Sequence, residues 1–344
     1  MSKQTNIAWT DSTAGPWLIC TEVSPGCANC YARELMVNRL KTIARKAFKA
    51  AGFKDWETRP VWGKTAPRIL TRDFRGKMLA MNKKPWICEA CGNATPNEPV
   101  YCGKCGFKSG SHRRRSFPSL IDWLDDMPAG IIDQDGNKLD PISVLADFLD
   151  TLRLCDQMVH ILCSKRPENW RERLAVSICE TESAATRNWI AGWLDASNPP
   201  KNVVILASVE NQAMADKRIP ELLKIPAACR GLSLEPLLSP VDLTPWIGSG
   251  GLHSSETQPK ISWQIIGGES GPQARPCDAR WIRSLIEQGQ SAGIAVFVKQ
   301  FGSNQIHFGP TGEQDFKTKL KDKKGADPFE WPVGFRIQQW PKGF

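Results

Sequence analysis

From residue 114 onward the sequence repeats one pattern: a short apolar run, a polar residue at its end, and then a segment with helical spacing. Continuous apolar runs are typical of parallel strands that are buried on both faces. Helical patterns follow several of the runs, near residues 142–154, 168–176, 211–224 and 278–292. This alternation predicts an α/β fold with a parallel sheet and crossover helices. The apolar runs are Ser116–Ile121, His160–Ser164, Val203–Val209, Gly231–Leu234, Ser262–Ile266 and Ala295–Val298.

The polar residues that end these runs are expected to lie on one face of the molecule. Right-handed crossovers place the carboxyl ends of parallel strands together, and in barrels that face is the usual site of catalysis. We therefore predict a partial or complete (β/α) barrel with its functional residues at these strand ends. Each residue also has a plain explanation, because charged side chains often cap strands and helices. The residues are Asp122, Lys165, Arg166, Glu210, Glu235, Glu269 and Lys299.

The loop Gly267-Gly268-Glu269-Ser270 follows one of these runs and is the most suggestive of a ligand. Glycines let backbone N–H groups approach a bound molecule, and a carboxylate binds an ammonium group. A tight turn alone would also need glycine. The loop does not match Gly-x-Gly-x-x-Gly, so it does not predict a dinucleotide-binding fold.

Three cysteines, Cys20, Cys27 and Cys30, lie close together near the N-terminus. They follow an apolar run, Pro16–Ile19, that predicts a short strand, and they precede a helical pattern from Tyr31 to about Ala50. Three thiolates can bind three irons of a [4Fe–4S] cluster and leave the fourth iron open. Two other interpretations stay open: a zinc site completed by a distant Cys or His, and buried thiols without a metal.

A second cysteine group has the spacing of a zinc ribbon. Two Cys-x-x-Cys pairs, each followed by glycine, suit four thiolates in tetrahedral geometry around Zn²⁺. We predict a ribbon inserted over residues 86–112, flanked by the basic segments Lys83-Lys84 and His112–Arg115. Zinc either stabilises an insertion too small to fold by itself or forms part of a nucleic-acid contact. The predicted ligands are Cys88, Cys91, Cys102 and Cys105.

Composition adds a preference for an acidic partner. The formal net charge is +9, which favours a nucleic acid or a nucleotide, although excess charge also serves solubility alone. No run of about 18 apolar residues and no signal-peptide core is present, so we expect a cytoplasmic protein without a membrane contact. Five further cysteines are expected to be small buried apolar residues: Cys155, Cys163, Cys179, Cys229 and Cys277.

Several phrases together resemble the phage Gp37/Gp68 family, an uncharacterised, radical-SAM-like group with a three-cysteine motif. The resemblance extends from about residue 4 to about residue 302. It implies a barrel-like domain over residues 1–302, with residues 303–344 as a loop-rich cap or tail. The phrases are Asn6–Asp11, Val23–Ala32, Ser164–Glu168, Ala207–Asn211, Leu232–Pro236, Gly267–Pro272 and Phe297–Gln300.

For chemistry, the resemblance implies a [4Fe–4S] cluster on Cys20, Cys27 and Cys30 whose open iron binds the amino and carboxylate groups of S-adenosylmethionine. Reductive cleavage would give a 5'-deoxyadenosyl radical that abstracts hydrogen from a substrate. The cysteines are separated by six and two residues, whereas three and two is commonest in radical-SAM proteins. The implied catalytic residues are Glu269, Lys165 and Glu235, and the implied cofactor contacts are Gly267, Gly268, Glu269, Ser270, Glu210 and Lys299.

Two functional hypotheses follow. In the first, the protein is a radical-SAM-type enzyme that acts on a nucleic acid or nucleotide, with a partner protein as a further possibility. In the second, it is a phage protein without redox chemistry that binds nucleic acid or a partner, and both cysteine groups bind zinc. Both hypotheses predict basic charge and a zinc ribbon, but only the first predicts an iron–sulfur cluster.

Overall fold

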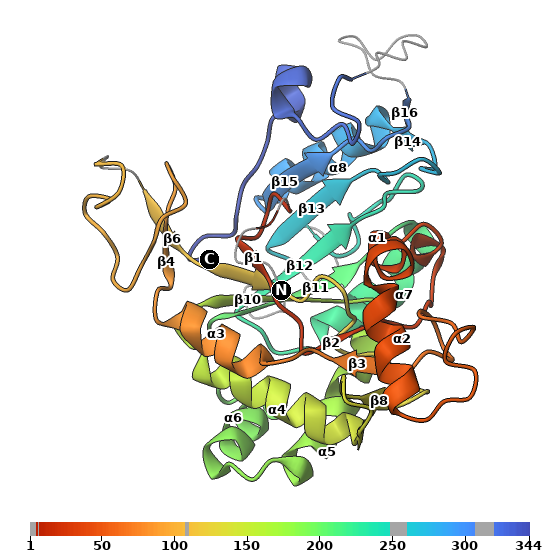
Figure 1. Ribbon diagram of the computed structural model, residues 1–344. Coiled ribbons are helices and arrows are strands. Elements are labelled where there is room, and N and C mark those ends of the chain that lie inside the picture. The colour runs from red at the N-terminus through yellow and green to blue at the C-terminus, as the bar shows by residue number, and fades with distance from the viewer. Residues whose placement is uncertain (1–4, 6, 107–109, 248–259, 307–319) are drawn as a thin grey trace.

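The computed structural model describes residues 5, 7–106, 110–247, 260–306 and 320–344. Its central element is a seven-stranded sheet in which each pair of neighbouring strands is parallel (Figure 1). The strands, in their order across the sheet, are β1 (Ser12–Thr13), β7 (Arg115–Phe117), β10 (Val159–Ser164), β11 (Val203–Ser208), β12 (Cys229–Leu234), β13 (Trp263–Gly267) and β15 (Ala295–Gln300).

Helices connect most of these strands, as expected for crossover units. Side chains at Asp140, Asn211 and Asp278 cap three of the helices by accepting a hydrogen bond from a backbone N–H in the first turn. The helices are α1 (Tyr31–Leu35), α2 (Lys41–Ala50), α3 (Phe74–Asn82), α4 (Pro141–Leu154), α5 (Trp170–Glu180), α6 (Ala184–Leu194), α7 (Gln212–Leu223) and α8 (Ala279–Ser291). A π-helical segment, Met36–Leu40, joins α1 to α2.

The predicted fold class is confirmed: the protein is an α/β chain whose parallel sheet forms a partial (β/α) barrel with a four-cysteine insert, consistent with a partial barrel of the radical-SAM type. Strand β11 shows why its run is apolar throughout. Val203, Ile205 and Ala207 belong to the core between sheet and outer helices, whereas Val204 and Leu206 belong to the inner core. Both faces are covered, so the sequence shows no polar alternation.

Two features at the N-terminal end differ from the expectation. The run around Trp17 does form a strand, β2 (Trp17–Leu18), but it lies in a second sheet with β3 (Arg68–Leu70), β8 (Ile131–Ile132) and β9 (Lys138–Leu139). The edge strand of the main sheet is instead β1, in a segment that we expected to be an extended lead-in. Two short polar residues carry no strand periodicity, so β1 could not be predicted from the local sequence.

The terminal segments fill the inner face of the half barrel. Trp9 packs against Phe117 and Trp263, with ring centroids 4.6 Å and 6.2 Å away. Near the other terminus, Trp340 packs on Phe297 at 4.9 Å, and the backbone of residues 337–339 runs along the edge of β15. This inner core closes one end of the half barrel and leaves the carboxyl ends of the strands for the site described below.

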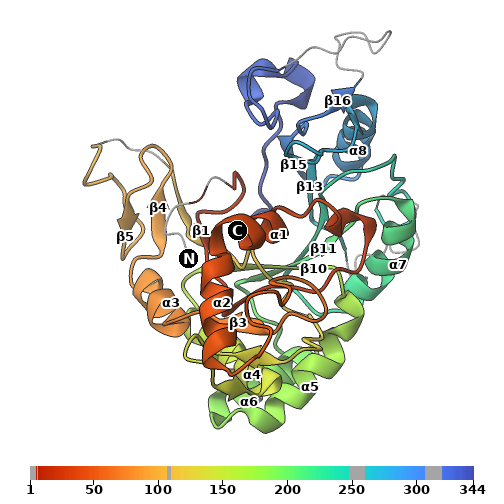
Figure 2. The same ribbon diagram turned by 45° about the vertical axis from the view of Figure 1, so that its right-hand side comes forward.

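The four-cysteine insert projects from the body as a small antiparallel sheet of β4 (Trp86–Cys88), β5 (Ala94–Thr95) and β6 (Ser111–Arg113) (Figures 1 and 2). The described part of 303–344 holds β16 (Gln305–Ile306), paired with β14 (Cys277–Asp278), and two 3-10 turns, Pro328–Glu330 and Val333–Phe335. Parts of the predicted divisions lie outside the described residues: 1–4, 6, 107–109, 248–259 and 307–319. The division into 1–302, 86–112 and 303–344 stays a prediction.

None of the helices in the described ranges is long and apolar enough to cross a membrane.

One buried group in the sheet gives a testable pH dependence. His160 in β10 is 1% exposed, its Nε2 lies 2.9 Å from the Cys155 carbonyl oxygen, and burial lowers its pKa to about 4. Because the unfolded chain binds this proton near pH 6.5, stability falls as the pH drops from about 6.5 to 4. Between pH 7 and pH 5 we expect the buried His160 to lower the free energy of unfolding by about 2 kcal/mol. Urea unfolding of His160→Gln should show a smaller loss than wild type over this range. An equal loss would contradict the assignment.

Candidate functional site

A cavity of about 660 Å³ opens at the carboxyl ends of the parallel strands. Both the three-cysteine loop and the strand-end residues contribute to its wall, which brings together segments more than 200 residues apart in the sequence. Gly267 and Glu210 do not line it and lie behind the wall. The predicted residues that line the cavity are Cys20, Cys27, Cys30, Lys165, Glu235, Gly268, Glu269, Ser270 and Lys299.

The three cysteines are held by a compact turn between β2 and α1. Pro25–Cys27 forms a 3-10 turn in which the Cys27 N–H donates to the Ser24 carbonyl at 2.9 Å. Cys30 is the N-cap residue of α1. Ile19, immediately before Cys20, has a φ of 84°, which is a strained conformation for a β-branched residue. Such strain is concentrated at functional sites in proteins.

The spacing of these thiols bears on the metal they suit. Within the described part of the chain, Cys20, Cys27 and Cys30 are not a group whose ligand atoms all lie within 4.8 Å, so at least one pair of sulfurs is farther apart. Four sulfurs around one Zn²⁺ would lie about 3.8 Å apart at Zn–S distances of ~2.3 Å. In a cubane cluster each cysteine instead binds a different iron. Among the described residues, the compact group that can hold a single ion is therefore the ribbon's four cysteines.

Glu210 stabilises the cysteine loop through its side-chain contacts with Ser24 and Gly26. Its side chain is fully buried, and it accepts hydrogen bonds from Ser24 Oγ at 2.7 Å and from Arg218 Nη1 at 2.8 Å. Gly26 packs directly on this carboxylate, since a Cβ at position 26 would lie 2.5 Å from Glu210 Oε1. In this geometry Glu210 supports the loop, and its predicted contact with a cofactor stays a prediction.

Glu269 fixes the other side of the loop. Its Oε2 accepts hydrogen bonds from Asn29 Nδ2 at 3.0 Å and from Arg275 N and Nε at 2.9 Å, and its Oε1 accepts one from Arg275 Nη2 at 2.6 Å. Arg275 also donates to the Pro25 carbonyl at 2.8 Å. Burial alone would raise the pKa of Glu269, but Arg275 and Asn29 lower it overall. Because both oxygens are engaged by this chain, the carboxylate is placed to position the loop, and its catalytic role stays a prediction.

The charged groups that face the cavity more freely are two lysines and one glutamate. Lys165 Nζ lies 3.0 Å from Ser208 Oγ and 3.6 Å from Glu210 Oε1. Burial would lower the pKa of Lys165, but Glu210 and the nearby thiols, Cys27 and Cys30 among them, raise it overall. Lys299 and Glu235 form an ion pair at 2.6 Å, with side chains 23% and 13% exposed. These groups retain access to a ligand in the cavity.

The two glycines of the 267–270 loop are explained by close packing. A Cβ at Gly268 would lie 2.1 Å from the Phe301 carbonyl oxygen, and one at Gly267 would lie 3.0 Å from Glu235 Oε1. Gly267 therefore makes room for the Glu235 carboxylate. Ser270 is half-buried in the cavity wall, and its role stays a prediction.

Several residues of the site escaped sequence reasoning. Asn29 and Arg275 hold Glu269, and Tyr31, 48% exposed, lines the cavity and donates its hydroxyl to the Ser119 carbonyl. The expectation that Cys163 is simply buried is wrong, because it is half-buried in the cavity wall, with Sγ 3.4 Å from Ser208 Oγ. Its position two residues before Lys165, at a strand end, is the signal that would have found it. Cys179 is exposed, whereas Cys155, Cys229 and Cys277 are buried as expected.

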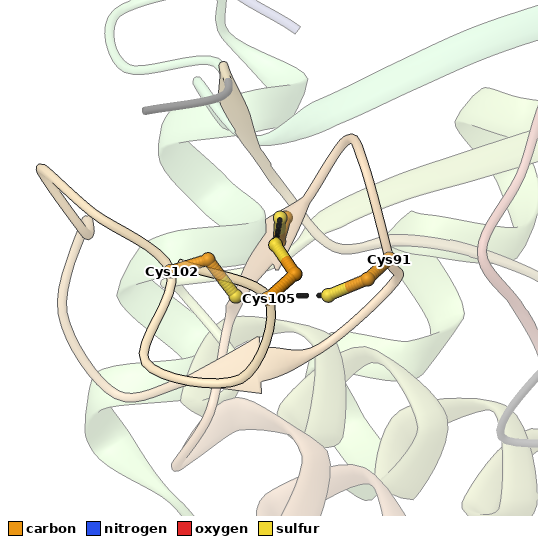
Figure 3. Close-up of side chains that lie close together, drawn as sticks. Cys91, Cys102 and Cys105 are labelled. Carbon is orange, nitrogen blue, oxygen red and sulfur yellow. Dashed lines mark hydrogen bonds between the residues drawn. The ribbon is translucent and has the colours of Figure 1, made fainter. Parts of the chain in front are cut away.

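The ribbon cysteines form a compact group that fits one metal ion. All four sulfurs lie within 4.8 Å of one another, with Cys88–Cys105 and Cys91–Cys102 distances of 3.9 and 3.6 Å. Figure 3 shows Cys91, Cys102 and Cys105 turned toward one another. These separations bracket the ~3.8 Å expected around tetrahedral Zn²⁺. Gly92 and Gly106 adopt φ values of 66° and 73°, as the two turns after the cysteine pairs require.

The basic flank of the ribbon differs from the expectation. Arg114 and Arg115 are each only 7% exposed, and burial lowers the pKa of both. Arg115 stacks on Trp340 at 4.5 Å and donates to the Phe344 carbonyl at 3.2 Å. His112 Nε2 lies 3.0 Å from Asp11 Oδ1. These residues anchor the ribbon to the body, which leaves less of the flank for nucleic acid than the sequence indicated.

The metal-binding capacity of the ribbon is testable. We expect Cys91→Ser to lower the zinc content from about one per chain to below about 0.1, because three thiolates with a weak fourth ligand bind Zn²⁺ far less well. Elemental analysis and limited proteolysis across residues 86–112 would measure the loss of metal and of local folding. Cys179→Ser, at an exposed and isolated thiol, is the control. Equal zinc in both variants would contradict the assignment.

Comparison with known proteins gives one informative match. A family model described as "Protein of unknown function (DUF5131)" matches residues 4–79 and 136–327. The cavity residues predicted from the sequence lie inside the matched ranges, whereas the four ribbon cysteines lie in the unmatched interval. Neither the curated proteins nor the solved structures contain a match. Because the matched residues make up well over half of the chain, the protein belongs to the DUF5131 family of proteins of unknown function.

Proposed function

We propose that the protein is a radical-SAM-type enzyme of the phage Gp37/Gp68 kind, with a [4Fe–4S] cluster on Cys20, Cys27 and Cys30. The observation that carries this proposal is the convergence of three thiols and the charged strand-end residues on one cavity of about 660 Å³. When bound, such a cluster supplies the electron that cleaves S-adenosylmethionine to methionine and a 5'-deoxyadenosyl radical. A fourth iron without a protein ligand is the position at which a cofactor can bind.

The donor set fits this group. Three soft thiolates suit iron–sulfur chemistry, and Lys165 lies near two of the thiols, Cys27 and Cys30. The cavity falls within the ~300–1,000 Å³ range of small-molecule sites.

The charged groups that line the cavity suit the two ends of an amino acid. In the proposed arrangement, Lys165 or Lys299 binds the carboxylate of the methionine moiety, and Glu235 binds its ammonium group. Lys299 and Glu235 are 2.6 Å apart, so they present opposite charges side by side. That pairing complements a zwitterion such as the α-amino carboxylate.

We expect Lys165→Met to weaken S-adenosylmethionine binding at least about tenfold, because a charge-assisted hydrogen bond contributes about 1.5–3 kcal/mol. Glu210 keeps its bonds to Arg218 and Ser24, so the loop should stay folded in this variant. Equilibrium dialysis with the anaerobically reconstituted protein would measure the affinity. Lys217→Met, which removes an exposed lysine paired with Glu168, is the matched control. Equal affinities for the two variants would exclude Lys165 as a contact.

A nucleic acid or nucleotide is the proposed substrate class. The helix that contributes Tyr31, Leu35 and Leu40 to the cavity continues into a segment with exposed basic residues, among them Lys41 and Lys46. Exposed cations on the same helical segment as an exposed aromatic ring suit a phosphate backbone and a stacked base. The net charge of +9 supports the same class.

The direct test of this function is product formation. Anaerobic protein reduced with dithionite and supplied with S-adenosylmethionine is expected to release methionine and 5'-deoxyadenosine, measured by chromatography. A single-stranded oligonucleotide should increase the yield if nucleic acid is the substrate. Absence of 5'-deoxyadenosine from a protein that carries the full cluster would overturn the proposal.

The second candidate is a non-enzymatic, zinc-stabilised phage protein that binds nucleic acid or a partner protein. The single-ion geometry of Cys88, Cys91, Cys102 and Cys105 is expected of both candidates, so the metal on the three-cysteine loop distinguishes them. Replacing residues 86–112 by a short linker separates the roles of the ribbon. If the ribbon only stabilises the insert, 5'-deoxyadenosine formation should persist, whereas loss of oligonucleotide binding with the fold retained would indicate recognition.

A further inference from the structure

A buried network of charges lies directly behind Cys20. Arg166 is 4% exposed, and its Nη1 donates to Asp122 Oδ2 at 2.8 Å, while its Nη2 lies 3.3 Å from Asp125 Oδ1. Arg68, which is fully buried, pairs with the same Asp125. Two guanidinium groups and two carboxylates thus compensate one another beneath the cysteine loop. A guanidinium keeps its charge at all relevant pH values, so this positive charge is fixed.

Arg166 and Cys20 meet at one carbonyl group. The Thr21 carbonyl oxygen accepts a hydrogen bond from Arg166 Nη2 at 2.8 Å and another from Cys20 Sγ at 3.4 Å. The guanidinium is therefore a close neighbour of the sulfur. Burial opposes the charge on Arg166, but Asp122, Asp125 and a hydrogen bond with Cys20 raise its pKa overall.

The two arginines differ in whether each of their side-chain nitrogens has a hydrogen-bond acceptor. Arg68 directs its Nε, Nη1 and Nη2 at oxygen atoms of Asp125, Gly63, Ala66 and Thr21. In contrast, the buried Nε–H of Arg166 has no hydrogen-bond acceptor among the described residues, and its ionic neighbour Asp126 is 3.8 Å away. This Nε–H lies beside Asp126, beyond hydrogen-bond distance, whereas the group that shares an acceptor with Cys20 is Nη2.

A metal-bound Cys20 would offer the neighbouring Nη2 group of Arg166 a further acceptor. A thiolate has no proton to donate to Thr21, and its sulfur becomes a good acceptor for an adjacent N–H. Hydrogen bonds to cysteine sulfurs raise the reduction potential of an iron–sulfur cluster, because they stabilise the more negative reduced state. This effect does not require Arg166 to touch the open iron or a substrate.

We propose that Arg166 is a positioning residue that donates an N–H hydrogen bond to the Cys20 thiolate and thereby raises the reduction potential of the bound cluster. This inference rests on the proposed function, since it presupposes a cluster on Cys20. It adds a role for a strand-end residue that does not line the cavity.

The test is the midpoint potential of the reconstituted full-length protein, followed by EPR during a redox titration. Arg166→Gln removes the charge, and Arg166→Lys keeps it but loses the fork of N–H donors. In Arg166→Gln we expect the ratio of reduced to oxidised cluster, at a fixed potential, to fall at least about tenfold, equivalent to about 59 mV. Arg166→Lys should fall by a smaller, measurable factor. Arg173→Gln, which removes another partner of Asp126, should match wild type.

The outcomes separate this inference from the proposed function. A wild-type protein that holds no iron after reconstitution would overturn both. A wild-type cluster with unchanged midpoint potentials in both Arg166 variants would overturn the inference alone. If Arg166→Gln fails to hold a cluster because Asp122 is left unpaired, Arg166→Lys decides: a lowered potential supports the inference, and an unchanged one overturns it.

Discussion

Replacing Cys27 by alanine is expected to abolish iron and sulfide binding and leave about one zinc per chain. The two remaining thiolates, Cys20 and Cys30, would leave two irons of a [4Fe–4S] cluster without a protein ligand, which is too few protein ligands for a stable cluster. The ribbon cysteines should be unaffected, because they form a separate group on an insert that projects from the body. Iron should fall from about four atoms per chain to below about 0.4, together with the charge-transfer absorbance. Elemental analysis and visible spectra would measure both.

The matched control is Cys163→Ala. Cys163 lines the same cavity and is half-buried, but it lies outside the three-cysteine loop. Its removal should leave iron and zinc at the wild-type level. If Cys27→Ala lowers zinc instead of iron, the three cysteines bind zinc and the iron–sulfur proposal fails.

Gly26→Ala is expected to destabilise the cluster without removing a ligand. The new Cβ would lie 2.5 Å from both Cγ and Oε1 of Glu210. Glu210 cannot move aside cheaply, because it is fully buried and bonded to Ser24 and Arg218. Overpacking of this kind costs about 1–3 kcal/mol, which corresponds to about five- to 160-fold in an equilibrium constant.

Iron retention measures this effect. Iron per chain after desalting and the rate of iron loss to a chelator should both worsen in Gly26→Ala. Gly334→Ala is the control, because a Cβ there meets no atom within 4 Å and its φ is not in the left-handed region. Identical rates of iron loss in the two variants would show that the loop does not depend on its contact with Glu210.

The parallel sheet was predictable because its strands are buried on both faces. Runs such as Val203–Val209 and Ala295–Val298 are long enough and apolar enough to be distinguished, and the strand-end rule then brought Lys165, Glu235 and Lys299 to one cavity. Strand β1 was missed because Ser12–Thr13 is held by pairing with β7, not by its own periodicity. Short edge strands of this kind depend on tertiary contacts that the local sequence does not encode.

Most of the site residues that were predicted from the sequence line the cavity, but the residues with which their side chains form hydrogen bonds were not predicted. Glu269 was expected to face a ligand, yet Arg275 and Asn29 occupy both of its oxygens. Nothing in the spacing indicates that pairing, because Asn29 lies 240 residues away in the sequence. The ribbon is the opposite case. Its ligand geometry follows from two short Cys-x-x-Cys turns, so local sequence was sufficient.

The measurement that tests the central claim most directly is the iron, sulfide and zinc content of anaerobically prepared protein, with visible and EPR spectra before and after adding S-adenosylmethionine. The account predicts about four irons and four sulfides on the three-cysteine loop, about one zinc on the ribbon, and a change in the EPR signal when the cofactor binds. Zinc alone, even after anaerobic reconstitution with iron and sulfide, would contradict it.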